Sequence, residues 1–146
     1  MSQPLLLLVP LVASLVWLAC RRPRFWEGAN LVAAVAVAGL AGRLGWEVLQ
    51  RGTVTAWSGL LYADALSALV ILLIAFVFLA CTVYAVGYFR EDERRKRVSP
   101  RQLRYYYVLT PLFVAVMLLI PMADNLGVMW VAAEGTTLAS VLLVTF

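Results

Sequence analysis

The sequence contains no histidine and only two cysteines, Cys20 and Cys81, which are too far apart in sequence to form a Cys-x-x-Cys pair. Zinc sites are built mainly from closely spaced histidine and cysteine ligands, and haem is most often held by an axial histidine. The sequence also lacks a glycine-rich phosphate loop and a Ser/His/Asp set. These absences predict a chain with no metal, no redox cofactor and no catalytic chemistry of its own.

Charged residues are also scarce. They make up 14% of the chain, against roughly 25% in an ordinary soluble domain. Hydrophobic residues make up 64%, and the mean hydropathy is +0.90. The apolar residues form continuous runs, whereas a membrane β-barrel shows alternating segments of about ten residues. The sequence therefore predicts an all-α integral membrane protein.

Five apolar runs are each close to the roughly 20 residues that a helix needs to cross a bilayer. The first run is followed, not preceded, by positive charges, which favours a retained helix over a signal peptide. We therefore expect a single membrane domain over residues 1–146. Its expected spans are residues 4–20, 29–49, 64–89, 105–123 and 126–146.

Positive charge is concentrated in the loops after the first and third runs. Loops of this kind stay on the cytoplasmic side of a membrane. The amino terminus is then expected outside, in the bacterial cytoplasmic membrane. The net charge of +4 follows from these loops, and next to a span they are expected to meet anionic lipid and not nucleic acid. The residues are Arg21, Arg22, Arg24, Arg90, Arg94, Arg95, Lys96, Arg97, Arg101 and Arg104.

Glu134 lies deep inside the last apolar run, in the stretch AEGTTLAS. An acid at the centre of a bilayer costs about 2.5 kcal/mol or more, so it usually serves proton or ion movement. A structural acid bonded to hydroxyls of neighbouring helices is the alternative. Thr137 shares the helix face of Glu134, and Ser140 follows one turn later. We predict a proton-transfer role for Glu134, Thr137 and Ser140.

Other polar residues lie at the edges of the runs. Asp124 and Asn125 separate the fourth and fifth runs, where they are expected either to cap the fifth helix or to mark where ions enter or leave. Asp64 is a cap candidate for the third helix. Arg43 and Glu47 have the i, i+4 spacing of an ion pair on a helix surface.

The residues from Ala123 to Phe146, ADNLGVMWVAAEGTTLASVLLVTF, resemble the fifth helix of antiporter-like subunits. These subunits occur in respiratory complex I, membrane-bound hydrogenases and multisubunit cation/proton antiporters. The form AEGTTLAS is most similar to the antiporter-like subunit of hydrogenase-4 and of formate-hydrogenlyase-type complexes. Residues 62–89 and 105–125 resemble the third and fourth helices of the same subunits.

The resemblance implies that Glu134 belongs to a proton path and pairs with a lysine on a later helix. Family members have about fourteen helices, including two inverted repeats, and transport sites form at the repeat interface. This chain reaches only the fifth helix, and its single lysine, Lys96, lies in a loop. We therefore expect a split subunit, a reduced subunit or a fragment of a longer protein.

The leading interpretation is a proton-translocating membrane subunit of a complex-I-like hydrogenase or dehydrogenase. Its expected partners are redox subunits, other membrane subunits including one with the later helices, and lipid. One alternative is a structural or assembly subunit without transport. Another is a subunit of a cation/proton antiporter or of an inorganic-carbon uptake system.

Overall fold

The computed structural model describes residues 2–20 and 23–145. Arg21 and Arg22, which the charge pattern includes among the basic residues after the first span, lie outside the described residues. Phe146, the expected end of the fifth span, lies outside them too.

The described residues form five helices, and all five are long and apolar enough to cross a membrane. This confirms the expected all-α membrane class. Several helices extend beyond the apolar runs that predicted them, because charged residues at the ends of a run continue the helix. The helices are α1 (Ser2–Ala19), α2 (Pro23–Arg51), α3 (Ala65–Arg94), α4 (Pro100–Met122) and α5 (Leu126–Val144).

Local hydrogen bonds fix the starts of two helices. The Asp64 side chain accepts a hydrogen bond from the Ser67 N–H at 2.8 Å and caps α3. At α4, the Ser99 hydroxyl accepts from the Gln102 N–H at 3.2 Å, and the Ser99 N–H donates to Gln102 Oε1 at 3.0 Å. This reciprocal pair is a capping box, which satisfies two backbone donors that the first turn leaves open.

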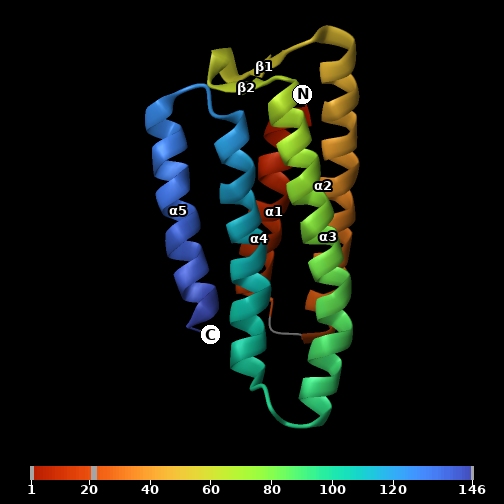
Figure 1. The fold of residues 1–146 in the computed structure, drawn as a ribbon. Coiled ribbons are helices and arrows are strands. Elements are labelled where there is room, and N and C mark those ends of the chain that lie inside the picture. Colours follow the sequence, from red (N-terminus) through yellow and green to blue (C-terminus); the bar gives the residue numbers. More distant parts are fainter. Residues whose placement is uncertain (1, 21–22, 146) are drawn as a thin grey trace.

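A short hairpin, which the sequence pattern does not predict, lies across one end of the helices (Figure 1). Strand β1 (Val54–Ala56) pairs antiparallel with β2 (Leu61–Ala63), and Val54 lies opposite Ala63. The turn between them, η1 (Trp57–Gly59), has three consecutive positive φ angles, of 52°, 56° and 94°. Only the last residue is glycine, which adopts such angles without steric cost. We call this side of the bundle the hairpin end.

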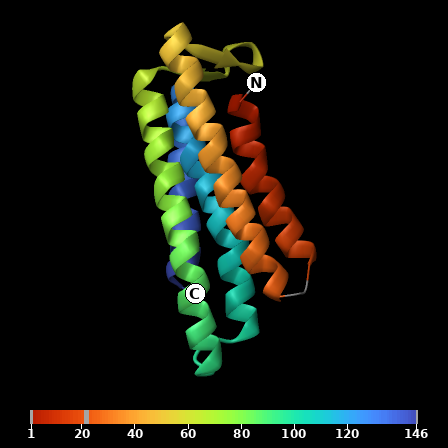
Figure 2. The ribbon, with the colours of Figure 1, turned by 90° about the vertical axis from the view of Figure 1, so that its right-hand side faces the viewer.

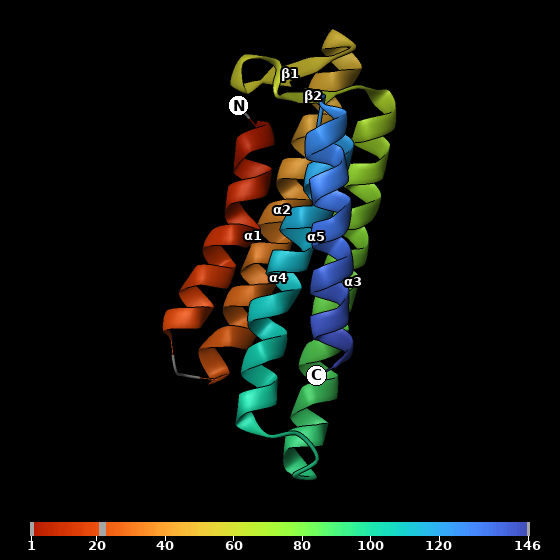
Figure 3. The ribbon, with the colours of Figure 1, turned by 90° about the vertical axis from the view of Figure 1, so that its left-hand side faces the viewer.

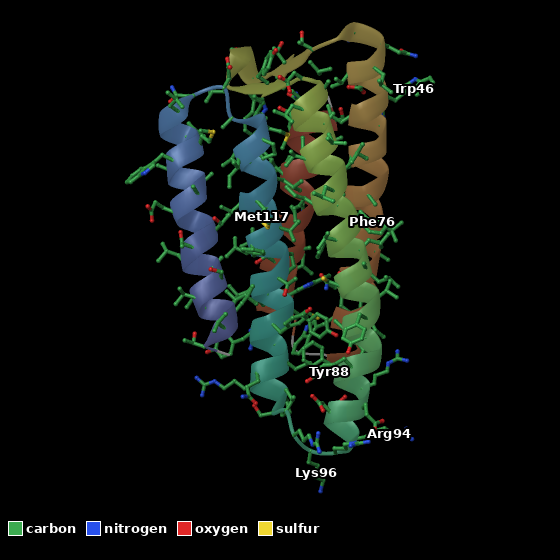
Figure 4. The ribbon with its side chains drawn as sticks, in the orientation of Figure 1. Trp46, Phe76, Tyr88, Arg94, Lys96 and Met117 are labelled. Atoms are coloured by element: carbon green, nitrogen blue, oxygen red, sulfur yellow. The ribbon has the colours of Figure 1, made fainter. Side chains whose placement is uncertain are left out.

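The opposite end carries the α3–α4 connection and is rich in arginine. Arg94 and Lys96 are labelled there in Figure 4. We call the segment from Arg90 to Arg104 the basic end. Helices α1 to α5 run alternately between the two ends, and the chain begins at the hairpin end (Figure 1). Consecutive short connections favour this antiparallel arrangement of neighbours.

Helices α1 to α4 form the packed part of the molecule. Helix α1 lies against α4, α2 lies against α3, and α5 contacts α4 on the outside of this group. The side views show the antiparallel helices closely aligned, with α5 adjacent to α4 (Figures 2 and 3). Helix α5 therefore has one covered side.

Two buried clusters hold the four-helix group together. The cluster nearer the hairpin end contains Leu6, Val37, Leu44, Ile71 and Leu118, all almost fully buried. The cluster nearer the basic end is aromatic and contains Trp17, Trp26, Phe89 and Tyr107, among others. Large hydrophobic side chains also cover the outer surface. Examples are Trp46 and Phe76, which are 64% and 68% exposed (Figure 4). A bilayer provides the apolar surroundings that these outer side chains need.

Candidate functional site

A line of small residues on α5 makes the contact with α4. Ala132 and Ala139 are buried on this line, and Gly135 lies between them in sequence. A β-carbon on Gly135 would lie 2.9 Å from Val116 Cγ1 of α4. Membrane helices pack through small residues because backbones can then approach closely. The sequence of α5 therefore specifies which of its sides faces α4.

Glu134 lies on a different side of the same helix. With 3.6 residues per turn, it is rotated by roughly 130° from the mean direction of the small residues. Its side chain is exposed. Among the described residues, the Glu134 carboxylate has no hydrogen-bond or ion-pair partner. The structure thus places this acid on the side of α5 that other described helices leave uncovered.

The hydroxyls around Glu134 bond to the backbone of their own helix. Thr137 Oγ1 donates to the Ala133 carbonyl at 2.9 Å, and Ser140 Oγ donates to the Thr137 carbonyl at 2.8 Å. Thr137 is exposed like Glu134, whereas Ser140 is half-buried. Each hydroxyl oxygen still has acceptor capacity. Glu134 and Thr137 therefore share an uncovered face, and Ser140 lies beside it.

Asp124 and Asn125 have different positions at the hairpin end. Asn125 is the N-cap of α5, where its Oδ1 accepts from the Gly127 N–H at 2.7 Å. Asp124 is exposed, and its backbone N–H donates to the Leu60 carbonyl at 3.3 Å. Asp124 thus joins the α4–α5 connection to the hairpin through its backbone, which leaves its carboxylate at the surface.

The amino terminus is also tied to the hairpin end. Gln3, which is 1% exposed, donates from Nε2 to the Val54 carbonyl at 2.8 Å. Ser2 Oγ donates to Glu47 Oε2 at 2.9 Å, and Arg43 Nε lies 3.4 Å from Glu47 Oε1. These contacts join α1, α2 and β1 at one edge.

The structure reveals a polar group that the sequence interpretation did not identify. Arg90 of α3 donates to Glu27 Oε2 of α2, and the Nη2–Oε2 distance is 2.9 Å. One turn further into α2 lies Asn30, which is fully buried with neither amide atom bonded to another described residue. The Tyr107 hydroxyl of α4 is buried and also has no partner among the described residues.

The sequence alone could have identified only some of these residues. Asn30 could have been identified, because it is an amide inside an apolar run of α2. Glu27 and Arg90 are 63 residues apart, and no local pattern connects them.

As for metals, the described part of the chain holds no group of three or more cysteine, aspartate or glutamate residues placed to bind an ion.

Comparison with known proteins gives a consistent family relationship. Residues 56–97 match the family described as NADH-ubiquinone oxidoreductase (complex I), chain 5 N-terminus. The chain is also 37% identical over 123 residues to NADH-quinone oxidoreductase subunit L of Mycobacterium tuberculosis, in strains CDC 1551 / Oshkosh and ATCC 25618 / H37Rv. Each alignment covers 79% of this chain and 18% of the relative.

The matched family segment begins at the last residue of β1 and continues to the basic end, so it covers η1, β2 and α3. The chain spans about a fifth of the length of these curated relatives. The chain is similar to the amino-terminal region of the antiporter-like family of multi-pass membrane subunits.

Proposed function

We propose that this chain is a proton-translocating membrane subunit, or part of one, in a complex-I-like assembly. Glu134 carries the transferred proton, and Thr137 and Ser140 hold water beside it. The single observation that supports this most strongly is the position of Glu134. It is an unpaired acid on the side of a membrane helix that no described helix covers.

An ionisable group at this depth is too costly to face lipid. The uncovered face of α5 must therefore meet another protein surface or a water-filled space. By analogy with the family that the chain resembles, we propose that a lysine on a later helix lies beside this acid. A cation brought close favours the ionised carboxylate, and its withdrawal favours the protonated form. A redox event elsewhere in the complex can then load and release a proton through this charge pair.

The similarity to these relatives supports the dehydrogenase form of the complex. They are subunits of an NADH-quinone oxidoreductase. The hydrogenase form rests on the stretch AEGTTLAS alone. In either form, the electron-transfer chemistry belongs to redox subunits, and a further membrane segment supplies the later helices. We propose both as partners of this chain.

The test is Glu134→Gln in the intact complex, with Glu91→Gln as the matched control. Both changes remove one exposed glutamate charge, and Glu91 lies at the basic end of α3. Electron transfer and proton uptake are measured in sealed vesicles, and assembly is measured by co-purification. We expect Glu134→Gln to lose proton uptake while the assembled complex remains, and Glu134→Asp to restore part of it. Full proton uptake in Glu134→Gln would support a structural subunit instead.

We also propose that the basic end lies in the cytoplasm of a bacterium and the hairpin end outside. This follows from the positive charge at residues 90–104. In a Cys20→Ser/Cys81→Ser background, Ser99→Cys and Thr55→Cys report the two ends, since both positions are exposed. A membrane-impermeant maleimide added to intact cells should label Thr55→Cys only. Labelling of Ser99→Cys alone would reverse the orientation.

A further inference from the structure

We propose that the groove between α1 and α4 at the basic end is a binding site for one anionic phospholipid. Its phosphate lies between Arg101 and Arg104, and an acyl chain follows the apolar side chains deeper in the groove. The groove encloses about 510 Å³. Its walls are Leu18, Arg101, Arg104, Tyr105, Val108 and Leu109.

The two arginines are available to an anion. Arg90 and Arg95, also at the basic end, are paired with Glu27 and Glu91. In the part of the chain that the structure describes, Arg101 and Arg104 form no ion pair with a carboxylate, and no acid lines the groove. Guanidinium groups bind phosphate through paired hydrogen bonds. The entrance of the groove thus has an unneutralised charge of the sign that a phospholipid phosphate requires.

Both guanidinium groups are already positioned. Arg104 Nη2 donates to the Leu18 carbonyl, one of the last carbonyls of α1. This bond uses one of five N–H groups, so the others remain as donors. Arg101 lies over the Tyr105 ring, with its central carbon 5.9 Å from the ring centroid. Less side-chain freedom is then lost when an anion binds, which lowers the cost of binding.

Along α4, the side chains that line the groove change from charged to apolar. A phospholipid changes in the same order, from its charged phosphate to its apolar acyl chains. Arg101, Arg104 and Val108 lie on one helix face at i, i+3 and i+7. At 1.5 Å per residue, Val108 is roughly 10 Å deeper along the helix than Arg101. Charge therefore comes first, the interfacial ring of Tyr105 next, and the apolar Val108 and Leu109 last. A free phosphate would bind the arginines but would make no contact with the apolar part of the groove. A helix covering the groove would bury two unpaired cations, at a high cost in free energy.

Native mass spectrometry of the protein, purified in mild detergent, tests the proposal. The probes are phosphatidylglycerol and phosphatidylcholine with identical acyl chains. We expect the wild type to retain phosphatidylglycerol in preference, by about tenfold or more, which corresponds to one strong charge-assisted contact. Equal retention of the two lipids, or retention of neither, would overturn the proposal.

Charge variants separate this groove from general attraction to a basic surface. Arg101→Gln/Arg104→Gln is compared with Arg94→Gln/Arg97→Gln, which removes the same charge from the same end but outside the groove. We expect the Arg101/Arg104 variant to lose the preference for phosphatidylglycerol. The Arg94/Arg97 variant should keep that preference within about twofold of the wild type. Equal losses in both would show diffuse electrostatics and reject the site. If the first variant does not fold, Arg101→Gln alone leaves the Arg104–Leu18 contact in place.

An apolar variant tests whether the acyl chain occupies the groove. Leu109→Trp fills the deeper part and leaves both arginines unchanged, and Leu66→Trp, at an exposed position of α3, is the control. We expect Leu109→Trp alone to lose retained lipid. If Leu109→Trp has no effect and inorganic phosphate displaces the lipid, the site binds free anions and the lipid assignment is wrong.

Discussion

Gly135 of α5 lies so close to α4 that a β-carbon at this position would be 2.9 Å from Val116 Cγ1. Real β-carbons do not come so near another heavy atom, and Val116 is β-branched with a restricted rotamer. The glycine thus fixes both the distance between the two helices and the rotation of α5. That rotation places Glu134 on the uncovered side.

Gly135→Ala should therefore lower the stability of the α4–α5 pair, although alanine favours helix. Overpacking of this kind costs about 1–3 kcal/mol. Val116→Ala in the same chain should restore most of the loss, since it removes the opposing methyl groups. Unfolding in mixed micelles, followed as a double-mutant cycle, measures the coupling between the two positions.

Gly87→Ala is the control for this cycle. A β-carbon on Gly87 meets nothing within 4 Å, so only the helix preference of alanine acts, and stability should stay equal or rise slightly. A neutral result for Gly135→Ala would show that α5 is not held at this distance from α4.

Removal of the Glu27–Arg90 pair should destabilise the protein more than removal of the Glu91–Arg95 pair. The Glu27 side chain is 12% exposed, whereas that of Glu91 is 52% exposed. A partly buried pair is screened less by water, so we expect Glu27→Gln to cost about 1 kcal/mol. Glu91→Gln should cost less. Thermal unfolding in detergent at low and high salt compares them, and equal losses would contradict the burial argument.

The Asp64 cap predicts a defined pH dependence. Hydrogen bonds from the Ser67 backbone and side chain hold the pKa of Asp64 below its usual value of 3.8. The ionised form therefore stabilises the fold at pH values above 3.8. This contribution is lost as the pH falls from the usual pKa through the lowered one.

Asp64→Asn isolates this effect, because asparagine also caps a helix but does not titrate. The difference in melting temperature between wild type and Asp64→Asn should shrink as the solution is acidified below about pH 4. A difference that stays constant with pH would show that the carboxylate charge does not contribute. Asp64→Ala, which removes the cap, should be less stable than both at neutral pH.

Gln3 is expected to hold the hairpin against the bundle. Its Nε2 donates to the Val54 carbonyl from a buried position. Gln3→Leu keeps a similar volume but leaves that carbonyl without its donor, which costs free energy when the group is buried. Hydrogen exchange of the 54–63 amides should become faster while exchange in α3 is unchanged. Thr55→Ala, at an exposed strand position, is the control that should alter neither.

Much of the helical architecture follows from local properties of the sequence. Continuous apolar runs predict five helices because each run is long enough to cross a bilayer and satisfies its backbone only as a helix. Asp64 predicts the start of α3 through its short side-chain acceptor. The sequence pattern does not predict the hairpin at residues 54–63, because its strands have three residues each and lack a strong alternating pattern.

In the candidate site too, one feature follows from the sequence and another depends on helix packing. Glu134 stands out in the sequence because an acid is costly inside an apolar run. The uncovered position of that acid depends on the packing of Gly135 against Val116, which sequence spacing does not reveal. Its role in proton transfer stays a prediction that the Glu134→Gln experiment tests.

The amino-acid sequence is sufficient to specify the membrane class, the five helices and the acid inside the fifth one, because composition and run length act locally along the chain. Helix packing, in contrast, is what brings Glu27 to Arg90, Gln3 to Val54, and Leu18 into one groove with Arg101 and Arg104. These contacts join residues far apart in sequence. Their geometry depends on how whole helices fit together, and that fit is set by the shapes of many side chains at once.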